Sequence, residues 1–418
     1  MLKVAGGQTL SGEITISGSK NASLPIIAAS LLFKKVTLKN IPHIGDVQTF
    51  LTLIESFGVK YSFDGNILKM DNSHIIAKNL DIGLIKKIRV GIFLLGALLP
   101  RFKELNIPYP GGCNIGKRSI DDHIKGFEAL GFKNLSRGDN VYLKGKLKDG
   151  DVVLNAQFSV TATENLLIGS IIRNGKTTIK LAAIEPHVLN LIDFLNKGGA
   201  KITLLYDHTI IINGVKSLKE EIKFEVISDY IESGTFIVFG ALAAKKYIDI
   251  KNARIADLTV FLEKAEEAGV KFEDLGNDIL RVHKCNNLKA VDIQTNVYPG
   301  FPTDLQSPFS VLLSQANGIS KIHEVLFEGR LNYLIELEKM KGHPAILNPH
   351  EALIFGKTQL KGTTVSSWDL RAGVAMIIAG TIAKGITHIT NVEYIERGYE
   401  NIIGKLDKLG VKVETIDN

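Results

Sequence analysis

The chain has few of the residues that define several large classes of protein. Two cysteines, Cys113 and Cys285, stand among 418 residues, which excludes a disulfide framework and favours a reducing cytoplasm. Its apolar runs extend to about twelve residues before Gly, Ser or Thr interrupts them, too short to cross a bilayer. Residues 1–9 lack the apolar core of a signal peptide. These absences predict a cytoplasmic protein that does not enter a membrane.

Neither sign of charge dominates the chain. The net charge is only +6, and there is no acidic or basic tail. Aromatic residues make up 7% of the chain, and no dense Lys/Arg stripe is interleaved with them, which argues against a nucleic-acid partner. The modest positive balance suits an anionic small molecule, or simply a basic surface.

An internal repeat accounts for the whole chain, which is too long for a single core. Six times, an amphipathic helix with apolar residues at i, i+3, i+4 and i+7 ends in a glycine and precedes a strand. The glycines are Gly58, Gly131, Gly199, Gly269, Gly342 and Gly410. The fifth copy is the weakest, because Lys341 stands where an apolar residue is expected. After Gly58, alternation over 59–63 and the turn at 64–66 predict a hairpin.

Each repeat also contains a helix that is apolar on nearly every side, and such a helix must be buried. The six segments are 22–32, 90–99, 164–172, 234–244, 306–316 and 372–383. Six buried helices, six surface helices and many short strands predict an α/β fold of two similar domains, each made of three repeats of about 70 residues.

Polar residues gather in the first turns of these apolar helices. The groups are Ser19-Lys20-Asn21, Lys86-Lys87 with Arg89, Ser159 with Thr161 and Thr163, Ser228-Asp229 with Glu232, Thr303-Asp304, and Asp369 with Arg371. Helix capping explains Ser, Thr and Asp there. It does not explain Lys20, Arg89 and Arg371, because a cation at a helix N-terminus opposes the helix dipole. An anion between them would remove the conflict, so the pattern predicts a polyanionic ligand.

A glycine-rich loop over 110–119 contains Cys113 close to Lys117 and Arg118. Neighbouring cations lower the pKa of a thiol and make it reactive, which we favour over a small buried hydrophobe. Residues 111–117 also match the nucleotide-binding pattern G-x-x-x-x-G-K. However, Arg118 occupies the place of the Ser or Thr that holds magnesium, which argues against a nucleoside triphosphatase.

Six motifs in order, from residue 18 to residue 400, resemble the enolpyruvyl transferase (EPSP synthase-like) family. They are Gly18-Ser19-Lys20-Asn21, Pro110-Gly111-Gly112-Cys113 with Gly116, Arg118 and Asp121, Phe301 to Gln306, Phe327-Glu328 with Arg330, Asp369-Leu370-Arg371, and Arg397-Gly398-Tyr399-Glu400. The cysteine loop is similar to that of the branch that acts on UDP-N-acetylglucosamine. The sister branch, which acts on shikimate 3-phosphate, lacks it.

The resemblance implies an inside-out α/β barrel with the active site in the cleft between two domains. One domain would be discontinuous, with residues 1–19 and 228–418, and the other would be inserted, with residues 20–227. The reaction implied is transfer of the enolpyruvyl group of phosphoenolpyruvate to the 3-hydroxyl of the UDP-sugar in peptidoglycan precursor synthesis. Phosphate would leave a tetrahedral phospholactoyl intermediate. The resemblance implies neither a cofactor nor a metal, and no nucleic-acid or membrane partner; the oligomeric state stays open.

By the same resemblance, Cys113 is the acid that protonates C3 of phosphoenolpyruvate, forms an adduct with it, and is the target of fosfomycin. Asp304 is the base, and Asp369 lies close to the reacting centre. Lys20, Arg118 and Arg397 are implied phosphate ligands, and Arg330 and Arg371 carboxylate ligands. The implied sugar-nucleotide contacts are Asn21, Arg89, Arg118, Ser119, Ile120, Asp121, Asp122, Ser159, Val160 and Leu326.

Two positions depart from the family pattern. Ser119 replaces the usual proline after the loop arginine, and Tyr230 stands where many members have a basic residue. Two other functions stay open. One is an enolpyruvyl transferase with a different acceptor, against which the cysteine loop argues. The other is a nucleic-acid-binding or RNA-end-processing protein with a similar repeat, against which the missing basic-aromatic patch argues.

Overall fold

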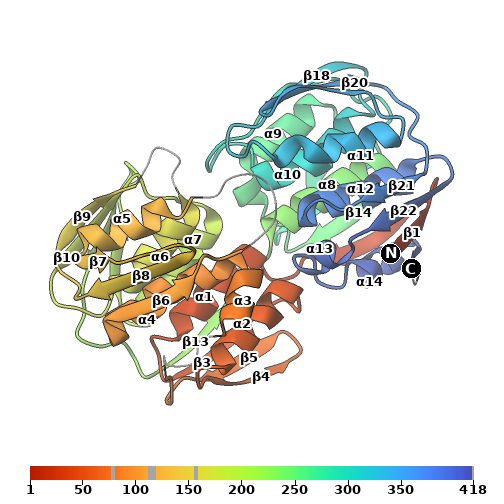
Figure 1. Cartoon of the computed structure of the whole chain (residues 1–418). Coiled ribbons are helices and arrows are strands. Elements are labelled where there is room, and N and C mark those ends of the chain that lie inside the picture. Colours follow the sequence, from red (N-terminus) through yellow and green to blue (C-terminus); the bar gives the residue numbers. More distant parts are fainter. Residues whose placement is uncertain (77–80, 112–118, 155–158, 417–418) are drawn as a thin grey trace. The chain divides into compact units, whose positions relative to one another are not determined.

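The computed structural model describes residues 1–76, 81–111, 119–154 and 159–416 (Figure 1). These residues form two compact units. Unit 1 contains residues 1–17 and 228–416, and unit 2 contains residues 18–111 and 119–227. The chain therefore leaves unit 1 after Ser17 and returns to it at Ser228. That the units act as the two domains expected from the sequence stays a prediction.

Unit 1 contains three sheets of four strands each. In spatial order, the strands of the first are β21 (Thr364–Ser366), β22 (Ile386–Thr390), β1 (Leu2–Ala5) and β23 (Val413–Thr415). Those of the second are β15 (Phe272–Asp274), β16 (Ile279–His283), β14 (Ala244–Lys251) and β2 (Leu10–Thr15). Those of the third are β17 (Ile293–Gln294), β18 (Gly318–His323), β20 (Glu351–Gly356) and β19 (Pro344–Asn348).

Unit 2 also contains three sheets. The first is β11 (Lys201–Leu204), β12 (Ile210–Asn213), β10 (Lys176–Lys180) and β9 (Gly150–Val153). The second is β13 (Glu221–Glu225), β3 (Lys35–Lys39), β5 (Ile67–Asp71) and β4 (Lys60–Asp64). The third is β6 (Glu104–Pro108), β8 (Asn140–Gly145) and β7 (Phe132–Asn134). The hairpin predicted after Gly58 is confirmed, since Asp64 of β4 pairs with Ile67 of β5.

The four-stranded sheets share one pairing pattern. In each, one edge strand is parallel to its neighbour and the other two pairings are antiparallel, as in β13-β3-β5-β4 and β2-β14-β16-β15. The N-terminal strand β1 completes the last repeat by pairing with both β22 and β23. The fold is therefore mixed α/β, and its six small sheets are consistent with six repeats.

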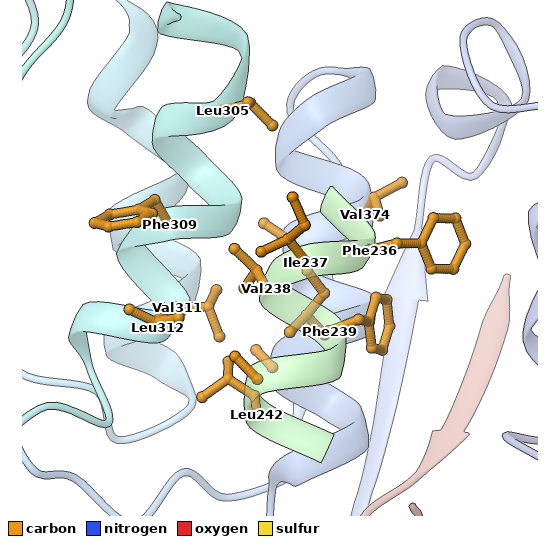
Figure 2. Packing of buried hydrophobic residues seen from close by; sticks show 14 of the residues in the cluster. Phe236, Ile237, Val238, Phe239, Leu242, Leu305, Phe309, Val311, Leu312 and Val374 are labelled. Carbon is orange, nitrogen blue, oxygen red and sulfur yellow. The ribbon is translucent and has the colours of Figure 1, made fainter. Parts of the chain in front are cut away.

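Three helices form the centre of each unit. They are α8 (Tyr230–Ala243), α10 (Thr303–Leu313) and α12 (Leu370–Ile382) in unit 1, and α1 (Lys20–Ser30), α4 (Leu94–Phe102) and α6 (Val160–Gly169) in unit 2. The three helices of a unit contact one another, and every residue of α8 is buried. Figure 2 shows Val238 and Leu242 of α8 on the side of Val311 and Leu312 of α10, with Phe239 pointing away from them. The predicted burial of the apolar helices is confirmed.

Amphipathic helices cover the sheets and the central helices. They are α2 (Gly45–Glu55), α5 (Asp121–Ala129), α7 (Pro186–Lys197), α9 (Thr259–Glu267), α11 (Tyr333–Lys339) and α14 (Ile402–Lys408). Short elements complete the described chain: α3 (Ile82–Lys87), α13 (Glu393–Glu396), η1 (Arg89–Phe93), η2 (Ile255–Leu258) and η3 (Arg330–Asn332). None of the helices in the described ranges is long and apolar enough to span a bilayer.

The end of the fifth repeat differs from the prediction by one residue. At the other five predicted ends, Gly58, Gly131, Gly199, Gly269 and Gly410, φ lies between 88° and 105°. In the fifth repeat Lys341 has this left-handed conformation, with φ 66°, and Gly342 follows it. The N–H of Gly342 donates to the carbonyl oxygen of Leu337 as that of Val59 donates to Ile54. The missing apolar residue before Gly342 thus reflects a shift of the helix end, and Lys341 occupies the glycine position.

Two helix starts also require correction. Lys86 and Lys87 do not begin the apolar helix; they end the separate helix α3, where a cation interacts favourably with the helix dipole. The apolar stretch expected over 90–99 begins as the 3-10 helix η1 and becomes α-helical only at Leu94.

Candidate active site

Two arginines converge on one carboxylate in unit 1. Asp304 is the second residue of α10, Arg371 is the second residue of α12, and Arg330 begins η3. Nη2 of Arg330 donates to Oδ1 of Asp304 at 2.5 Å, and Nε of Arg371 donates to Oδ2 at 3.3 Å. The arginine side chains are 5% and 1% exposed, while that of Asp304 is 27% exposed. The fold thus brings three predicted site residues into contact across 67 residues of chain.

Both arginines also have buried N–H groups in excess of their partners. Nε of Arg330 and both terminal nitrogens of Arg371 have no acceptor in hydrogen-bonding geometry within the described part of the chain. The ring of Tyr399 lies 5.0 Å from the guanidinium carbon of Arg371. Buried donors without acceptors are costly, so this arrangement favours the arrival of an anion.

The charge state of these arginines follows from their surroundings. Burial disfavours the charge on Arg330, but Asp304, Asp369 and Glu324 outweigh it and raise the pKa of Arg330 above its usual value. For Arg371, burial is likewise outweighed, here by Tyr399 and the nearby carboxylates, so its pKa is also raised. Both side chains are therefore permanent cations held in a buried setting.

Asp369 caps α12. Its Oδ1 accepts from the N–H of Arg371 at 2.7 Å and of Ala372 at 3.0 Å, and the residue is 5% exposed. Asp229 caps α8 in the same way, through the N–H groups of Ile231 and Glu232. The capping explanation for acidic residues at these helix starts therefore holds, and it places Asp369 beside Arg371.

Glu324 is a residue of this site that the sequence analysis missed. It is fully buried, and its Oε2 accepts from Oγ1 of Thr303 at 2.8 Å and Nε2 of Gln306 at 3.0 Å. Its Oε1 accepts from the backbone N–H groups of Leu326 and Phe327. Glu324 thus joins the start of α10 to the segment of Leu326. The available signal was period-two alternation, which places Glu324 on the buried face of Ile322.

In unit 2 the cation at the start of α1 is paired. Nζ of Lys20 lies 3.0 Å from Oδ2 of Asp46 in the first turn of α2, and their side chains are 13% and 7% exposed. Ser19 caps α1 by accepting from the N–H of Ala22 at 3.3 Å. Asn21 follows Lys20 in the first turn. The pairing explains how Lys20 is tolerated at a helix N-terminus.

A second group in unit 2 brings Arg89 to the start of α5. Nη2 of Arg89 donates to the carbonyl oxygen of Ser119 at 3.1 Å, and Oγ of Ser119 accepts from the N–H of Asp121 at 3.0 Å. Ile120 is buried beneath this turn, and Asp122 follows in the first turn of α5. Ser119 therefore supplies a hydrogen bond at the position where a proline was expected.

A buried polar network supports this part of unit 2. A ring nitrogen of His123 lies 3.1 Å from Oγ1 of Thr161, and the other lies 2.9 Å from Nδ2 of Asn165. Asn165 also accepts from the N–H of Gly96 at 2.6 Å near the start of α4. Burial, and secondarily Arg89, lower the pKa of His123 to about 3, so the ring is neutral. The network ties α4, α5 and α6 together behind Ser159 and Val160, where α6 begins.

The remaining predicted residues are placed as follows. Arg397 caps the C-terminal end of α13 and is half-buried. Tyr230 is 4% exposed within the core of unit 1. Cys113 and Arg118 lie outside the described residues. Within the described ranges, no three His, Cys, Asp or Glu side chains are grouped so that they could hold a metal ion.

Comparison with known proteins extends over the whole chain. The profile of the family named EPSP synthase (3-phosphoshikimate 1-carboxyvinyltransferase) matches residues 4–406. UDP-N-acetylglucosamine 1-carboxyvinyltransferase 2 of Bacillus subtilis is 38% identical over 413 residues, which cover 99% of this chain and 96% of the relative. UDP-N-acetylglucosamine 1-carboxyvinyltransferase of Prochlorococcus marinus is 41% identical over 422 residues, which cover 99% and 90%.

Solved structures show the same architecture at low sequence identity. The enolpyruvyl transferase NikO from Streptomyces tendae has a TM-score of 0.90 with 24% identity, covering 99% of this chain and 98% of that one. EPSP synthase from Acinetobacter baumannii has a TM-score of 0.73 with 16% identity, covering 99% of both chains. These likenesses establish the fold, and the full-length sequence matches establish the relationship. The chain belongs to the EPSP synthase family.

Proposed function

We propose that this chain transfers the enolpyruvyl group of phosphoenolpyruvate to the 3-hydroxyl of UDP-N-acetylglucosamine, releases phosphate, and so serves peptidoglycan precursor synthesis. One observation carries the proposal: relatives named UDP-N-acetylglucosamine 1-carboxyvinyltransferase are 38% and 41% identical over 99% of the chain. The family also includes enzymes of shikimate 3-phosphate, but the cysteine loop at 110–119 favours the UDP-sugar as acceptor.

The carboxylate of phosphoenolpyruvate would bind to Arg330 and Arg371. The support is the set of buried guanidinium N–H groups without acceptors in the described chain. A planar guanidinium can bind a carboxylate through two parallel hydrogen bonds. Lys20, Arg118 and Arg397 would bind the phosphate.

Asp304 would act as the base and Cys113 as the acid. As the sugar oxygen attacks C2 of phosphoenolpyruvate, Asp304 takes the hydroxyl proton and Cys113 gives a proton to C3. The tetrahedral phospholactoyl intermediate then loses phosphate and a C3 proton, which restores the carbon–carbon double bond. Asp369, next to Arg371, would keep the local charge balanced during these steps.

The contacts proposed for the UDP-sugar are those that the family resemblance implies. The residues are Asn21, Arg89, Arg118, Ser119, Ile120, Asp121, Asp122, Ser159, Val160 and Leu326. Two hydrogen bonds support pre-formed geometry at these residues. Arg89 donates to the carbonyl oxygen of Ser119, and the N–H of Leu326 donates to the carboxylate of Glu324.

The same family resemblance implies a finer architecture for the two units. Each unit would be an inside-out α/β barrel of three repeats of about 70 residues, with residues 1–19 and 228–418 as the discontinuous domain and 20–227 as the inserted one. The common strand order of the four-stranded sheets supports this view. Three apolar helices at the centre of each unit also support it.

The deciding experiment measures phosphate release from phosphoenolpyruvate with and without UDP-N-acetylglucosamine, before and after fosfomycin treatment. Release that needs the sugar and stops after fosfomycin supports the reaction. Cys113→Ala should abolish or greatly slow turnover, while Cys113→Asp should keep some activity and resist fosfomycin. No release with this sugar would indicate another acceptor, and full activity of Cys113→Ala would contradict the role of the thiol.

A further inference from the structure

A buried ion-pair network lies where the chain leaves and re-enters unit 1. The N–H of Asp229 donates to the carbonyl oxygen of Ser17 at 2.9 Å, so the departing and returning segments are joined. The N–H of Ser17 donates to Oε2 of Glu232 at 2.9 Å. Its hydroxyl donates to the carboxylate of Glu400 and accepts from Nζ of Lys405 at 2.7 Å. Ser17 is therefore held by three charged side chains.

Two of the charged members of this network are largely shielded from solvent, and the third, Glu400, is partly buried. Lys405 and Glu232 form a salt bridge with side chains 11% and 4% exposed. Burial raises the pKa of Glu232, and the charge of Lys405 opposes that rise. A buried ion pair contributes little net stability, because removing both charges from water costs about as much as their attraction returns. The network is therefore better explained by the geometry that it fixes around Ser17 than by a contribution to stability.

The network adjoins the segment of Arg397. Each of the next three residues after Arg397 contacts a different part of unit 1. A Cβ on Gly398 would lie 2.6 Å from Cδ1 of Leu370, at the start of α12. The hydroxyl of Tyr399 lies 2.9 Å from Oγ1 of Thr235 in α8. Glu400 accepts from Ser17.

We propose that Glu400, Lys405 and Glu232, acting through Ser17, are positioning residues that orient Arg397 toward the phosphate group of the substrate. The inference rests on the proposed function, in which Arg397 is a phosphate ligand. Without the network, the segment 397–401 keeps its contacts through Gly398 and Tyr399 but loses its anchor at Ser17. Binding of phosphoenolpyruvate and of inorganic phosphate then weakens, while binding of the sugar nucleotide in the other contacts stays the same.

The test uses Ser17→Ala, which removes only the hydroxyl, and Lys405→Met, which removes the cation. Lys264→Met is the matched control, because Lys264 pairs with Glu267 at 2.7 Å on the exposed face of α9. We expect about a tenfold rise in KM for phosphoenolpyruvate and in the inhibition constant of inorganic phosphate, since small misplacements of a ligand carry large kinetic costs. KM for UDP-N-acetylglucosamine should stay within about twofold of the parent value in the same variants.

Arg397→Ala separates the two claims. If it weakens phosphate binding and both network variants behave as the control does, the positioning role is wrong. If Arg397→Ala itself leaves phosphoenolpyruvate and phosphate binding unchanged, the assignment of Arg397 fails and the inference fails with it. Should Lys405→Met not fold, Ser17→Ala decides, because it leaves Lys405, Glu232 and Glu400 able to pair with one another. A uniform loss in all kinetic constants, sugar included, would also contradict the inference.

Discussion

At the scale of single residues, the proposed base is occupied. Both oxygens of Asp304 accept from guanidinium groups, so this carboxylate has fewer lone pairs to offer a substrate. The carboxylate of phosphoenolpyruvate would compete for the same two arginines. Arrival of the substrate would therefore release Asp304 for the proton transfer.

The variant Asp304→Asn tests this competition. We expect kcat to fall by about 10²–10⁴-fold, as for loss of a general base. We also expect phosphoenolpyruvate to bind more tightly, because a neutral amide competes less well for Arg330 and Arg371. Equilibrium titration with phosphoenolpyruvate gives the affinity, and Asp407→Asn, at an exposed position on α14, is the control. Weaker binding by the Asp304→Asn variant would show that Asp304 does not compete with the substrate.

His123 gives unit 2 a pH-dependent stability. Its pKa falls from 6.5 to about 3 on burial, so the folded protein binds fewer protons than the unfolded chain between these values. The stabilising effect is present above pH 6.5 and is lost as the pH falls toward 3, by up to about 1.4 kcal/mol per pH unit. Urea unfolding of His123→Gln and wild type across this range should show a difference that changes with pH. His74→Gln, at an exposed site, should run parallel to wild type.

At the scale of elements, the end of α11 contains a residue that suits its conformation poorly. Lys341 has φ 66°, where a Cβ is strained, while Gly342 follows in a tight place. A Cβ on Gly342 would lie 2.7 Å from the carbonyl oxygen of Leu337. Lysine therefore occupies the left-handed position that favours glycine, and glycine occupies the next position. Replacing Lys341 can relieve strain, whereas Gly342 has no room for a side chain.

Lys341→Gly should stabilise the protein by about 0.5–1 kcal/mol, because the left-handed strain of a lysine exceeds the extra chain entropy of glycine. Gly342→Ala should destabilise it, because its new methyl group meets backbone. Urea unfolding curves of both variants provide the comparison. Equal effects of the two substitutions would mean that the left-handed position does not set the stability of this helix end.

At the scale of the whole molecule, each unit has its own hydrophobic core. The core of unit 1 includes Phe236, Phe239 and Phe309, and that of unit 2 includes Phe127 and Phe194. Each of the six sheets in the described residues lies entirely within one unit, and no sheet is shared between the two units. A chain with two such cores should contain two cooperative folding units.

Phe239→Ala and Phe194→Ala test that division. Both rings are fully buried, so each truncation should cost about 3–5 kcal/mol. Hydrogen exchange followed by mass spectrometry should show faster exchange mainly within residues 228–416 for the first variant. For the second, the effect should concentrate in residues 18–227. Loss of protection spread evenly over both units in either variant would contradict independent cores.

Much of the architecture was accessible from the sequence because it depends on local periodicity. The apolar spacing of residues 230–243 and 370–382 is enough to predict buried helices, whatever they pack against. The sequence did not predict where the helix of the fifth repeat ends. Only the backbone conformation shows that Lys341 takes the position that glycine occupies in the other repeats. Family motifs identified the arginines, while the roles of Cys113 and Arg118 stay predictions.

The sequence by itself determined the buried helices and the cations near helix starts, because each is a pattern within about fifteen residues. It also determined the six repeats, because one helix pattern that ends in glycine recurs about every 70 residues. Only the tertiary structure decided which groups these cations, and other buried charges such as Lys405, meet. Arg371 pairs with Asp304 across 67 residues, and Lys405 pairs with Glu232 across 173. Lys405 also donates a hydrogen bond to the hydroxyl of Ser17 across 388 residues. The physical reason is that an ion pair needs two side chains within about 4 Å, and packing of distant elements sets that distance while local propensity does not.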